Sequence, residues 1–170
     1  MSKRFTFTTA LLLSLAATAC SSTESPATGA ASSAAPAAGP VVHDGRAVEI
    51  TANDTMKFSI VEIRAKAGER LSVTLVNQGT TPKFSMGHNW VLVTSSANVD
   101  AFLMAAAEAA TTDYVPASKR AEILAATKLL GPGERDTATF AAPTVPGTYP
   151  FLCSYPGHAQ VGMRGVLIVE

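Results

Sequence analysis

Short stretches in which hydrophobic and polar residues alternate dominate the chain from residue 47 onward. In the clearest stretch, apolar side chains at positions 71, 73 and 75 alternate with Ser72 and Thr74, which is typical of a strand with one buried face. Glycine- and proline-containing turn signals separate the stretches, so the pattern predicts an all-β domain. The expected strands are residues 47–51, 58–65, 71–77, 89–94, 137–140, 148–153 and 165–169.

Two segments between these strands have a different pattern. Residues 99–110 are rich in alanine, leucine and methionine, and Asp100 suits the first turn of a helix. We therefore predict a short helix there. Residues 122–130 are ambiguous, because their alanines allow a helix whereas their apolar positions alternate as in a strand.

The segment around His88 has an informative side-chain parity. In an extended chain His88 shares one face with Met86, Trp90 and Leu92, whereas the intervening residues, beginning with Asn89, face the other way. Trp90 and Leu92 are expected in the core. His88 is then expected where the core meets the rim of the domain.

The first twenty residues have the features of an export signal. Lys3 and Arg4 precede a short apolar run centred on residues 11–15, and small residues then lead to Cys20. The run is too short to predict a transmembrane helix. Cys20 resembles the lipidated cysteine of a bacterial lipoprotein, and the alternative is an ordinary secretory signal in which Cys20 is incidental. Both interpretations place the protein outside the cytoplasm, in the periplasm or an equivalent compartment.

Residues 21–46 are mostly alanine, serine, threonine, proline and glycine, and we predict that they form a flexible tether. About 22 residues of this composition have a typical reach of roughly 25 Å. His43 lies near the end of this segment and is expected to be a solvated histidine rather than a metal ligand. The folded domain is expected to comprise residues 47–170.

Charge balance and cysteine content argue against a nucleic-acid-binding protein and against a disulfide-stabilised one. Charged residues make up 15% of the chain, and 13 basic side chains balance 13 acidic ones, so nothing indicates a nucleic-acid partner. The two cysteines are Cys20 and one near the C-terminus, which makes a structural disulfide unexpected. We expect one folded domain that is monomeric.

Three potential metal donors lie within eleven residues near the C-terminus: Cys153, His158 and Met163. Pro156 and Gly157 between the first two predict a tight loop joining two strands. Taken alone, the segment is also compatible with a free cysteine, a surface histidine and a core methionine. Together with His88, however, the donors are a thiolate, two imidazoles and a thioether, which is the ligand set of blue copper sites. The alternative for His88 is a core histidine whose ring nitrogens are hydrogen-bonded.

Two motifs resemble those of the cupredoxins, within their azurin and auracyanin branch. They are Gly87-His88-Asn89-Trp90 and Cys153-Ser154-Tyr155-Pro156-Gly157-His158, and the resemblance extends over residues 47–170. Asp113-Tyr114 and residues 127–134 resemble the flap of azurins and the strand after it. Four residues separate His158 from Met163, where azurins usually have three, and this spacing is more similar to that of auracyanins. The resemblance implies a Greek-key β-sandwich with a short helical flap insertion, and it favours a strand in residues 122–130.

The resemblance also implies roles for individual residues. One copper ion would be bound by His88, Cys153 and His158, with Met163 as a weak axial donor and the Gly87 carbonyl opposite it. Asn89 would tie the histidine strand to the cysteine loop through Ser154. An apolar docking rim would surround a partly exposed His158. Its members would be Met86, Tyr155, Pro156, Gly157 and Ala159. Asn77 stands where many azurins have a pH-responsive histidine, so we expect no such switch.

We therefore predict a small blue (type 1) copper protein that cycles between Cu(II) and Cu(I) and exchanges electrons with donor and acceptor redox proteins. The alternative is an extracytoplasmic copper-binding or copper-delivery protein without redox cycling. A multicopper enzyme is excluded because the three histidines of the chain cannot build further copper centres. No enzymatic activity is expected.

Overall fold

The computed structural model describes residues 45–170. The expected signal segment and nearly all of the expected tether, including Cys20 and His43, lie outside the described residues. Within residues 45–170, no helix has the length and apolar character needed to cross a membrane.

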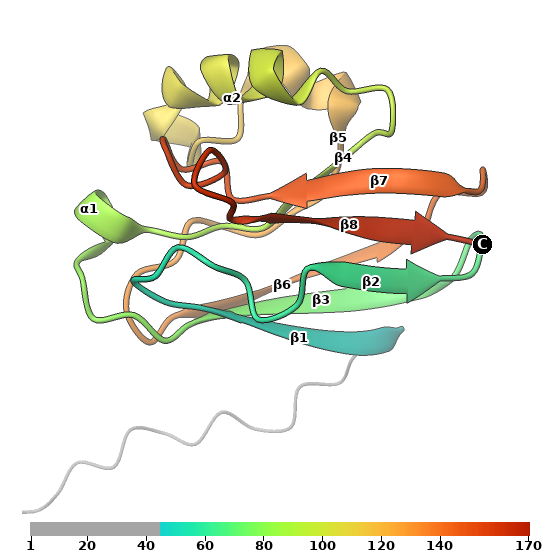
Figure 1. The fold of residues 1–170 in the computed structure, drawn as a ribbon, viewed down its shortest axis with the longest axis horizontal. Helices are drawn as coiled ribbons and strands as arrows, with labels where there is room; N and C mark the ends of the chain where they lie inside the picture. Colours follow the sequence, from blue (N-terminus) through green and yellow to red (C-terminus); the bar gives the residue numbers. More distant parts are fainter. Residues whose placement is uncertain (1–44) are drawn as a thin grey trace, which may run out of the picture. The chain divides into compact units, whose positions relative to one another are not determined.

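Two β-sheets pack face to face and form a sandwich (Figure 1). The smaller sheet has the order β1-β3-β6, with β1 parallel to β3 and β6 antiparallel to it. The larger sheet has the order β2-β8-β7-β4-β5, in which only β2 and β8 are parallel neighbours. The strands are β1 (Arg46–Ala52), β2 (Glu62–Ala65), β3 (Arg70–Asn77), β4 (Val91–Val93), β5 (Ile123–Ala126), β6 (Arg135–Ala141), β7 (Gly147–Leu152) and β8 (Arg164–Val169).

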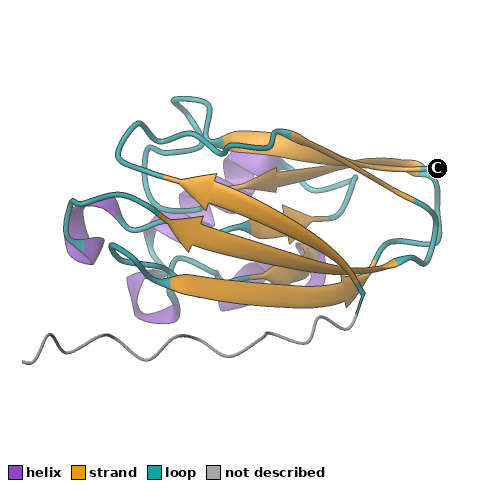
Figure 2. Cartoon of the chain, turned by 90° about the horizontal axis from the view of Figure 1, so that it is seen from below, coloured by secondary structure: helices purple, strands orange, loops and turns teal. Residues whose placement is uncertain are grey.

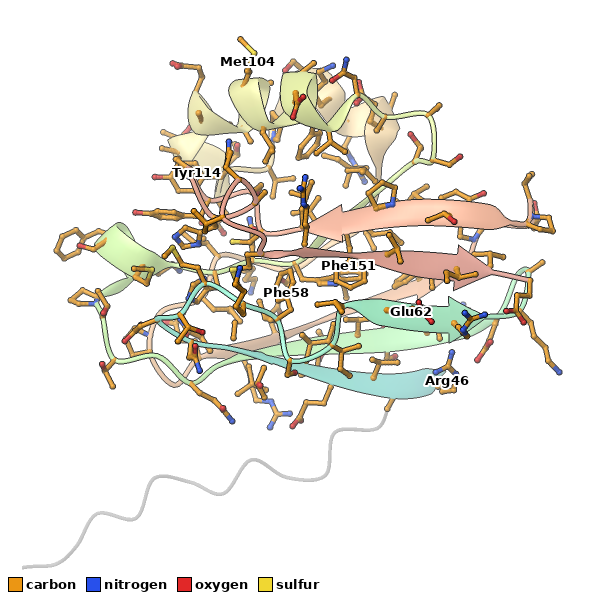
Figure 3. The ribbon with its side chains drawn as sticks, viewed as in Figure 1. Arg46, Phe58, Glu62, Met104, Tyr114 and Phe151 are labelled. Carbon is orange, nitrogen blue, oxygen red and sulfur yellow. The ribbon has the colours of Figure 1, made fainter. Side chains whose placement is uncertain are left out.

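The main core lies between the two sheets and follows the alternation in the sequence. Leu71, Val73 and Leu75 of β3 are fully buried, and Trp90 packs with Phe151 of β7 at a ring-centroid distance of 5.5 Å. Phe58 also contacts Phe151, at a ring-centroid distance of 5.8 Å, and both side chains are labelled in Figure 3. Burial of this apolar surface is the main force that holds the sheets together.

A helical layer covers the outer face of the larger sheet. Helix α2 (Val99–Ala107) begins after Asn98, whose side chain accepts a hydrogen bond from the Ala101 amide and so caps the helix. Phe102 and Ala106 of α2 pack against Val91, Val93 and Leu152 of the sheet. Two 3₁₀ helices, Ala110–Thr112 and Ala117–Glu122, continue this layer. Seen from below, the three-stranded sheet lies in front and the helices lie behind it (Figure 2).

The predicted β-sandwich with a helical insertion is confirmed, but several boundaries differ. The expected strand 58–65 is wrong in its first half, where only Phe58 forms a single bridge with Ala52 before β2 begins. The predicted helix ends at Ala107 rather than at residue 110. The ambiguous segment 122–130 contains the strand β5, as the family resemblance implied. The folded domain includes Arg46, which starts β1 and had been assigned to the tether.

The short helix α1 (Lys83–Met86) was not expected from the sequence. Pro82 precedes it, and the Pro82 carbonyl accepts hydrogen bonds from the amides of Ser85 and Met86. Met86 therefore belongs to a helical turn and not to the extended segment that carries His88. The parity is correct from Trp90 onward, because Trp90 and Leu92 lie in the core between the sheets whereas Val91 and Val93 face α2.

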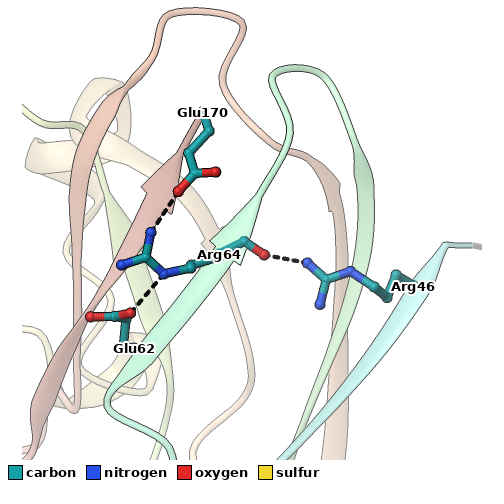
Figure 4. A network of polar contacts seen from close by, with 4 residues as sticks. All are labelled: Arg46, Glu62, Arg64 and Glu170. Carbon is teal, nitrogen blue, oxygen red and sulfur yellow. Dashed lines mark hydrogen bonds and ion pairs between the residues drawn. The ribbon is translucent and has the colours of Figure 1, made fainter.

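The end of the sandwich opposite α1 carries a network around Arg64 of β2 (Figure 4). The Arg64 guanidinium contacts Glu62 at 2.9 Å and Glu170 at 2.5 Å, and Arg46 of β1 donates to the Arg64 carbonyl at 2.5 Å. The network links an edge strand of one sheet to an edge strand of the other. Because its charges are exposed, each ion pair contributes little to stability.

Candidate metal centre

His88 lies just before β4 and is fixed by its backbone. Its amide donates to the Leu130 carbonyl at 3.1 Å, and the Leu130 amide donates to the His88 carbonyl at 2.7 Å. The imidazole is fully buried, and neither ring nitrogen has a hydrogen-bond partner within residues 45–170. Leaving both nitrogens of a buried imidazole unpaired is costly, so the ring is not a satisfied core histidine. It is available to a ligand.

The loop between β7 and β8 turns the other donors inward. The Cys153 amide donates to the Met163 carbonyl at 3.0 Å, and the Met163 amide donates to the His158 carbonyl at 2.9 Å. Gly157 and Gly162 have φ values of 87° and 98°, which favour glycine, at two points where the loop reverses. The Lys57 ammonium group donates a hydrogen bond to the Val161 carbonyl and so holds the loop from outside. This contact was not predicted from the sequence.

The side chains of His88, Cys153 and His158 converge on one point. One donor atom from each residue lies within 4.8 Å of the donor atoms of the other two. The Cys153 Sγ is 3.5 Å from the His158 Nδ1, and the two imidazole centroids are 5.0 Å apart. Cys153 is fully buried and His158 is only 3% exposed. A sulfur donor and two ring nitrogens thus share a site that excludes water.

Burial also sets the protonation of these groups. Desolvation raises the pKa of Cys153 to about 12, so the thiol keeps its proton at neutral pH until a metal displaces it. Desolvation and the neighbouring His88 lower the pKa of His158 to about 4. Desolvation likewise lowers the pKa of His88. Both imidazoles are therefore held in the neutral form that binds metals.

Asn89 connects the segment of His88 to the loop of Cys153. Its side chain donates to the Ser154 hydroxyl at 2.8 Å and accepts a hydrogen bond from the Ser154 amide at 2.8 Å. It also donates to the Asp113 carbonyl in the flap at 2.8 Å. Asn89 and Ser154 are both buried, so these contacts fix the relative position of two ligand-bearing segments.

Gly87 and Met163 lie beside these three residues. Met163 is fully buried in the core cluster that also contains Cys153. A side chain at position 87 would bring a Cβ atom to 2.7 Å from the Lys83 carbonyl and 2.9 Å from the Leu129 side chain, so packing alone requires glycine there. Coordination by the Met163 sulfur and by the Gly87 carbonyl remains a prediction.

The expected docking rim needs two corrections. Ala159 is fully buried against the residues beneath α2, because one turn of helix-like backbone after Gly157 directs it inward. It is not a rim residue. His158 was expected to be partly exposed, but the ring of Tyr155 lies against it with centroids 4.6 Å apart. Met86 and Tyr155 are half-buried, whereas Pro156 and Gly157 are exposed.

Sequence reasoning did not predict the contacts and exposure of several residues around the site. Phe84 of α1 is 82% exposed and adds a large apolar side chain next to the rim. Asn77 donates to the Leu130 carbonyl at 3.1 Å, so it supports the residue that brackets His88. Asp113 and Tyr114 have φ values of 57° and 59°, which are unusual for residues other than glycine. Only the resemblance to azurins had singled out that pair.

The donor set fits copper. A thiolate and two imidazoles suit copper in both oxidation states, and the unpaired nitrogens of buried His88 would gain a partner from the metal. A β-sandwich that brings these donors together at one end defines the class of mononuclear blue copper proteins.

Comparisons with known proteins agree with this assignment. The sequence model of the copper-binding proteins of the plastocyanin/azurin family matches residues 45–170. The chain is 37% identical over 126 residues to the outer membrane protein H.8 of Neisseria gonorrhoeae, covering 73% of this chain and 68% of that protein. It is 36% identical over 126 residues to the azurin of Pseudomonas denitrificans, covering 72% of this chain and 97% of the azurin. The crystal structure of a reduced auracyanin from Roseiflexus castenholzii superposes with a TM-score of 0.65 at 39% identity, covering 73% of this chain and 96% of the auracyanin.

The chain belongs to the plastocyanin/azurin family of copper-binding proteins, in its azurin and auracyanin branch. It is a blue copper electron-transfer protein, and His88, Cys153 and His158 are arranged as a copper-binding site.

Proposed function

We propose that the protein is a one-electron carrier that cycles between Cu(II) and Cu(I) and passes electrons from a donor redox protein to an acceptor. The observation that carries this proposal is the convergence of Cys153, His88 and His158 within 4.8 Å in a buried, pre-formed site. When bound, copper supplies the one-electron couple. The chain's own residues hold the donors in place.

An electron carrier needs a protein that holds the metal-binding side chains in fixed positions. Asn89 and Ser154 lock the two ligand segments together, and the paired backbone bonds with Leu130 fix His88. Donors that move little between the two oxidation states keep the reorganisation on electron transfer small. We further propose that the Met163 thioether and the Gly87 carbonyl would add two weak donors to the three buried ones.

The experiment that tests this proposal combines visible absorption with voltammetry on the purified copper-loaded protein. A carrier should show intense blue absorption that disappears on reduction and returns on oxidation, with a reversible one-electron wave. A copper-delivery protein without redox cycling should instead be colourless with Cu(I). It should also transfer its metal readily to a competing chelator.

Partner docking is proposed at the apolar rim next to His158. After the correction at Ala159, the rim consists of Met86, Tyr155, Pro156 and Gly157, extended by Phe84. An apolar surface close to the metal would let a redox partner approach within a short distance of the His158 ring. We infer that the protein acts as a carrier rather than as an enzyme, and that it is a monomer between encounters.

Export and membrane attachment complete the proposal. The N-terminal signal pattern and Cys20 suggest a lipid-anchored protein outside the cytoplasm, held by a tether that ends near residue 46. The described domain begins with β1 at the end of the sandwich opposite α1 and the metal site (Figure 1). The site would therefore be distant from the point at which the tether enters the domain.

A further inference from the structure

A second contact joins the two ligand segments at the surface. The Tyr155 hydroxyl donates a hydrogen bond of 2.6 Å to the Phe84 carbonyl. Tyr155 belongs to the loop that carries Cys153 and His158, whereas Phe84 lies in α1, directly before the segment of His88. The pair therefore repeats, on the outside of the site, the link that Asn89 and Ser154 make inside it.

The ring of Tyr155 also covers one of the ligands. It lies 4.6 Å from the His158 ring, centroid to centroid, at an interplanar angle of 37°. Tyr114 of the flap, labelled in Figure 3, meets the Tyr155 ring edge-on at a centroid distance of 4.9 Å. His158 is only 3% exposed although its neighbours Pro156 and Gly157 are exposed. The Tyr155 ring thus covers part of His158.

Within residues 45–170, few other contacts hold helix α1 against this loop. It has four residues, none of them buried, and no side chain caps its first turn. The Phe84 side chain projects into solvent, and the exposed pair of Lys83 and Glu134 is separated by 3.7 Å. Such an exposed ion pair contributes little to the stability of the contact between α1 and its surroundings. The Tyr155 hydroxyl accordingly supplies a direct hydrogen bond between α1 and the ligand loop.

We propose that Tyr155 is a positioning residue of the copper site. Its hydroxyl holds α1 against the ligand loop, and this contact keeps the ring in place over His158. The contact thereby limits how often His158 turns outward to accept or release copper. The inference rests on the proposed copper-binding function, and it assigns a role to the hydroxyl separate from that of the aromatic ring.

The variant Tyr155→Phe removes only the hydroxyl and keeps the ring. A single hydrogen bond of this type changes an opening equilibrium by roughly two- to tenfold. We therefore expect the apoprotein of Tyr155→Phe to take up Cu(II) two- to tenfold faster in stopped-flow mixing, followed through the growth of blue absorption. Its final blue spectrum should remain close to that of the unmodified protein, because the three buried donors are unchanged.

Tyr149→Phe is the matched control. Tyr149 also donates its hydroxyl to a backbone carbonyl, that of Val145 at 2.7 Å, but it lies near the start of β7 and away from the ligand loop. Loss of this bond should lower stability without changing copper uptake. Equal uptake rates in Tyr155→Phe and Tyr149→Phe would overturn the proposal.

A second readout needs no metal. The amides of Ser85 and Met86 both donate to the Pro82 carbonyl. In the apoprotein of Tyr155→Phe these amides should exchange with deuterium faster than in the unmodified apoprotein, whereas in Tyr149→Phe their exchange rates should not change. Failure to bind copper at all would contradict the proposed function, yet this exchange measurement would still test the contact. Unchanged exchange in Tyr155→Phe would overturn the positioning role.

Phe84→Ala separates the hydrogen bond from apolar cover. The Phe84 carbonyl remains in this variant, so the contact with Tyr155 should persist and copper uptake should stay at the unmodified rate. Copper uptake that is faster than in the unmodified protein in Phe84→Ala but normal in Tyr155→Phe would show that the Phe84 side chain covers the site instead. That result would overturn the proposal.

Discussion

Asn89 and Ser154 exchange two hydrogen bonds of 2.8 Å each, although 65 residues separate them in the chain. The Asn89 amide nitrogen donates to the Ser154 hydroxyl, and its oxygen accepts the Ser154 backbone amide. One residue follows the ligand His88 and the other follows the ligand Cys153, so the pair transmits any shift of one ligand segment to the other.

Replacing Asn89 should therefore cost more than an ordinary surface substitution. Asn89→Ala leaves the buried Ser154 amide and the Asp113 carbonyl without their partner, which should lower the free energy of unfolding by about 2–4 kcal/mol. Ser154→Ala removes only one hydroxyl and should cost about 1 kcal/mol. Urea denaturation of the two apoproteins measures both values. Equal losses would show that the backbone bond to Asn89 contributes nothing.

Cys153→Ser should give a folded protein without the blue colour. Serine differs from cysteine only in having oxygen in place of sulfur, so the loop around this buried side chain can fold as before, but its hydroxyl supplies no thiolate to the copper. We expect weaker copper binding and no intense visible absorption, measured by titration with Cu(II). Near-UV circular dichroism of the apoprotein serves as the folding control. Blue colour in this variant would refute the assignment of Cys153 as a ligand.

Met163→Leu tests the axial donor. The thioether favours Cu(II) over Cu(I) while contributing little to retention of the metal, so a residue of similar volume without a donor should raise the reduction potential. A tenfold change in a one-electron equilibrium corresponds to about 59 mV, and we expect a rise of tens of millivolts by voltammetry. The protein should stay blue. If Met163 is only a core residue, the potential will not move.

Copper uptake should release one proton per chain at neutral pH. Burial raises the pKa of Cys153 to about 12, so the apoprotein carries a thiol that must lose its proton when the metal binds. The pKa of His158 is lowered to about 4 and that of His88 is also lowered, so both imidazoles are neutral and neither has to lose a second ring proton when the metal binds. Because binding releases one proton, affinity should rise about tenfold per pH unit around pH 7.

Calorimetry in buffers of different ionisation enthalpy counts these protons directly. Cys153→Ser is the control, and it should release none. Release of two or more protons by the unmodified chain would mean that a histidine is protonated in the apo site, contrary to its burial.

Cys20→Ala tests the proposed anchor, which lies outside the described residues. If Cys20 carries lipid, the variant should leave the membrane fraction and appear in the soluble extracytoplasmic fraction. Fractionation with immunodetection measures this. The lipid-free variant should keep its blue colour, because the copper ligands all lie in the described domain. Unchanged membrane association would show that Cys20 does not anchor the protein.

The sequence predicted those parts of the fold that depend on local pattern. β3 alternates clearly between apolar and polar residues and lies where expected, and the parity of Trp90 and Leu92 placed them in the core. Helix α1 was missed because four residues are too few to show a helical period. Its position depends on the Pro82 carbonyl and on the distant Tyr155 hydroxyl, which no local pattern reveals.

The same distinction applies to the site. Cys153 and His158 became candidates once His88 was considered with them, and coordination by Met163 stays a prediction, whereas the cover over His158 arises from three-dimensional packing. Ala159 looked like a rim residue because it follows an exposed Pro-Gly pair, but the turn after Gly157 buries it under α2. The contributions of Leu130 and Asn77 to holding His88 likewise come from contacts between segments that are distant in sequence.

The uneven spacing of the ligands along the chain also has a consequence for folding thermodynamics. The thiol of Cys153 and the imidazole of His158 are five residues apart, so they remain neighbours even in a denatured chain. His88 joins them only after the larger sheet has closed a loop of some 65 residues, which carries an entropic cost. A denatured chain can therefore retain copper with part of its ligands. Any binding to the unfolded state reduces the stabilisation that the metal gives to the native state, so copper protects the fold only through its extra affinity for the complete site.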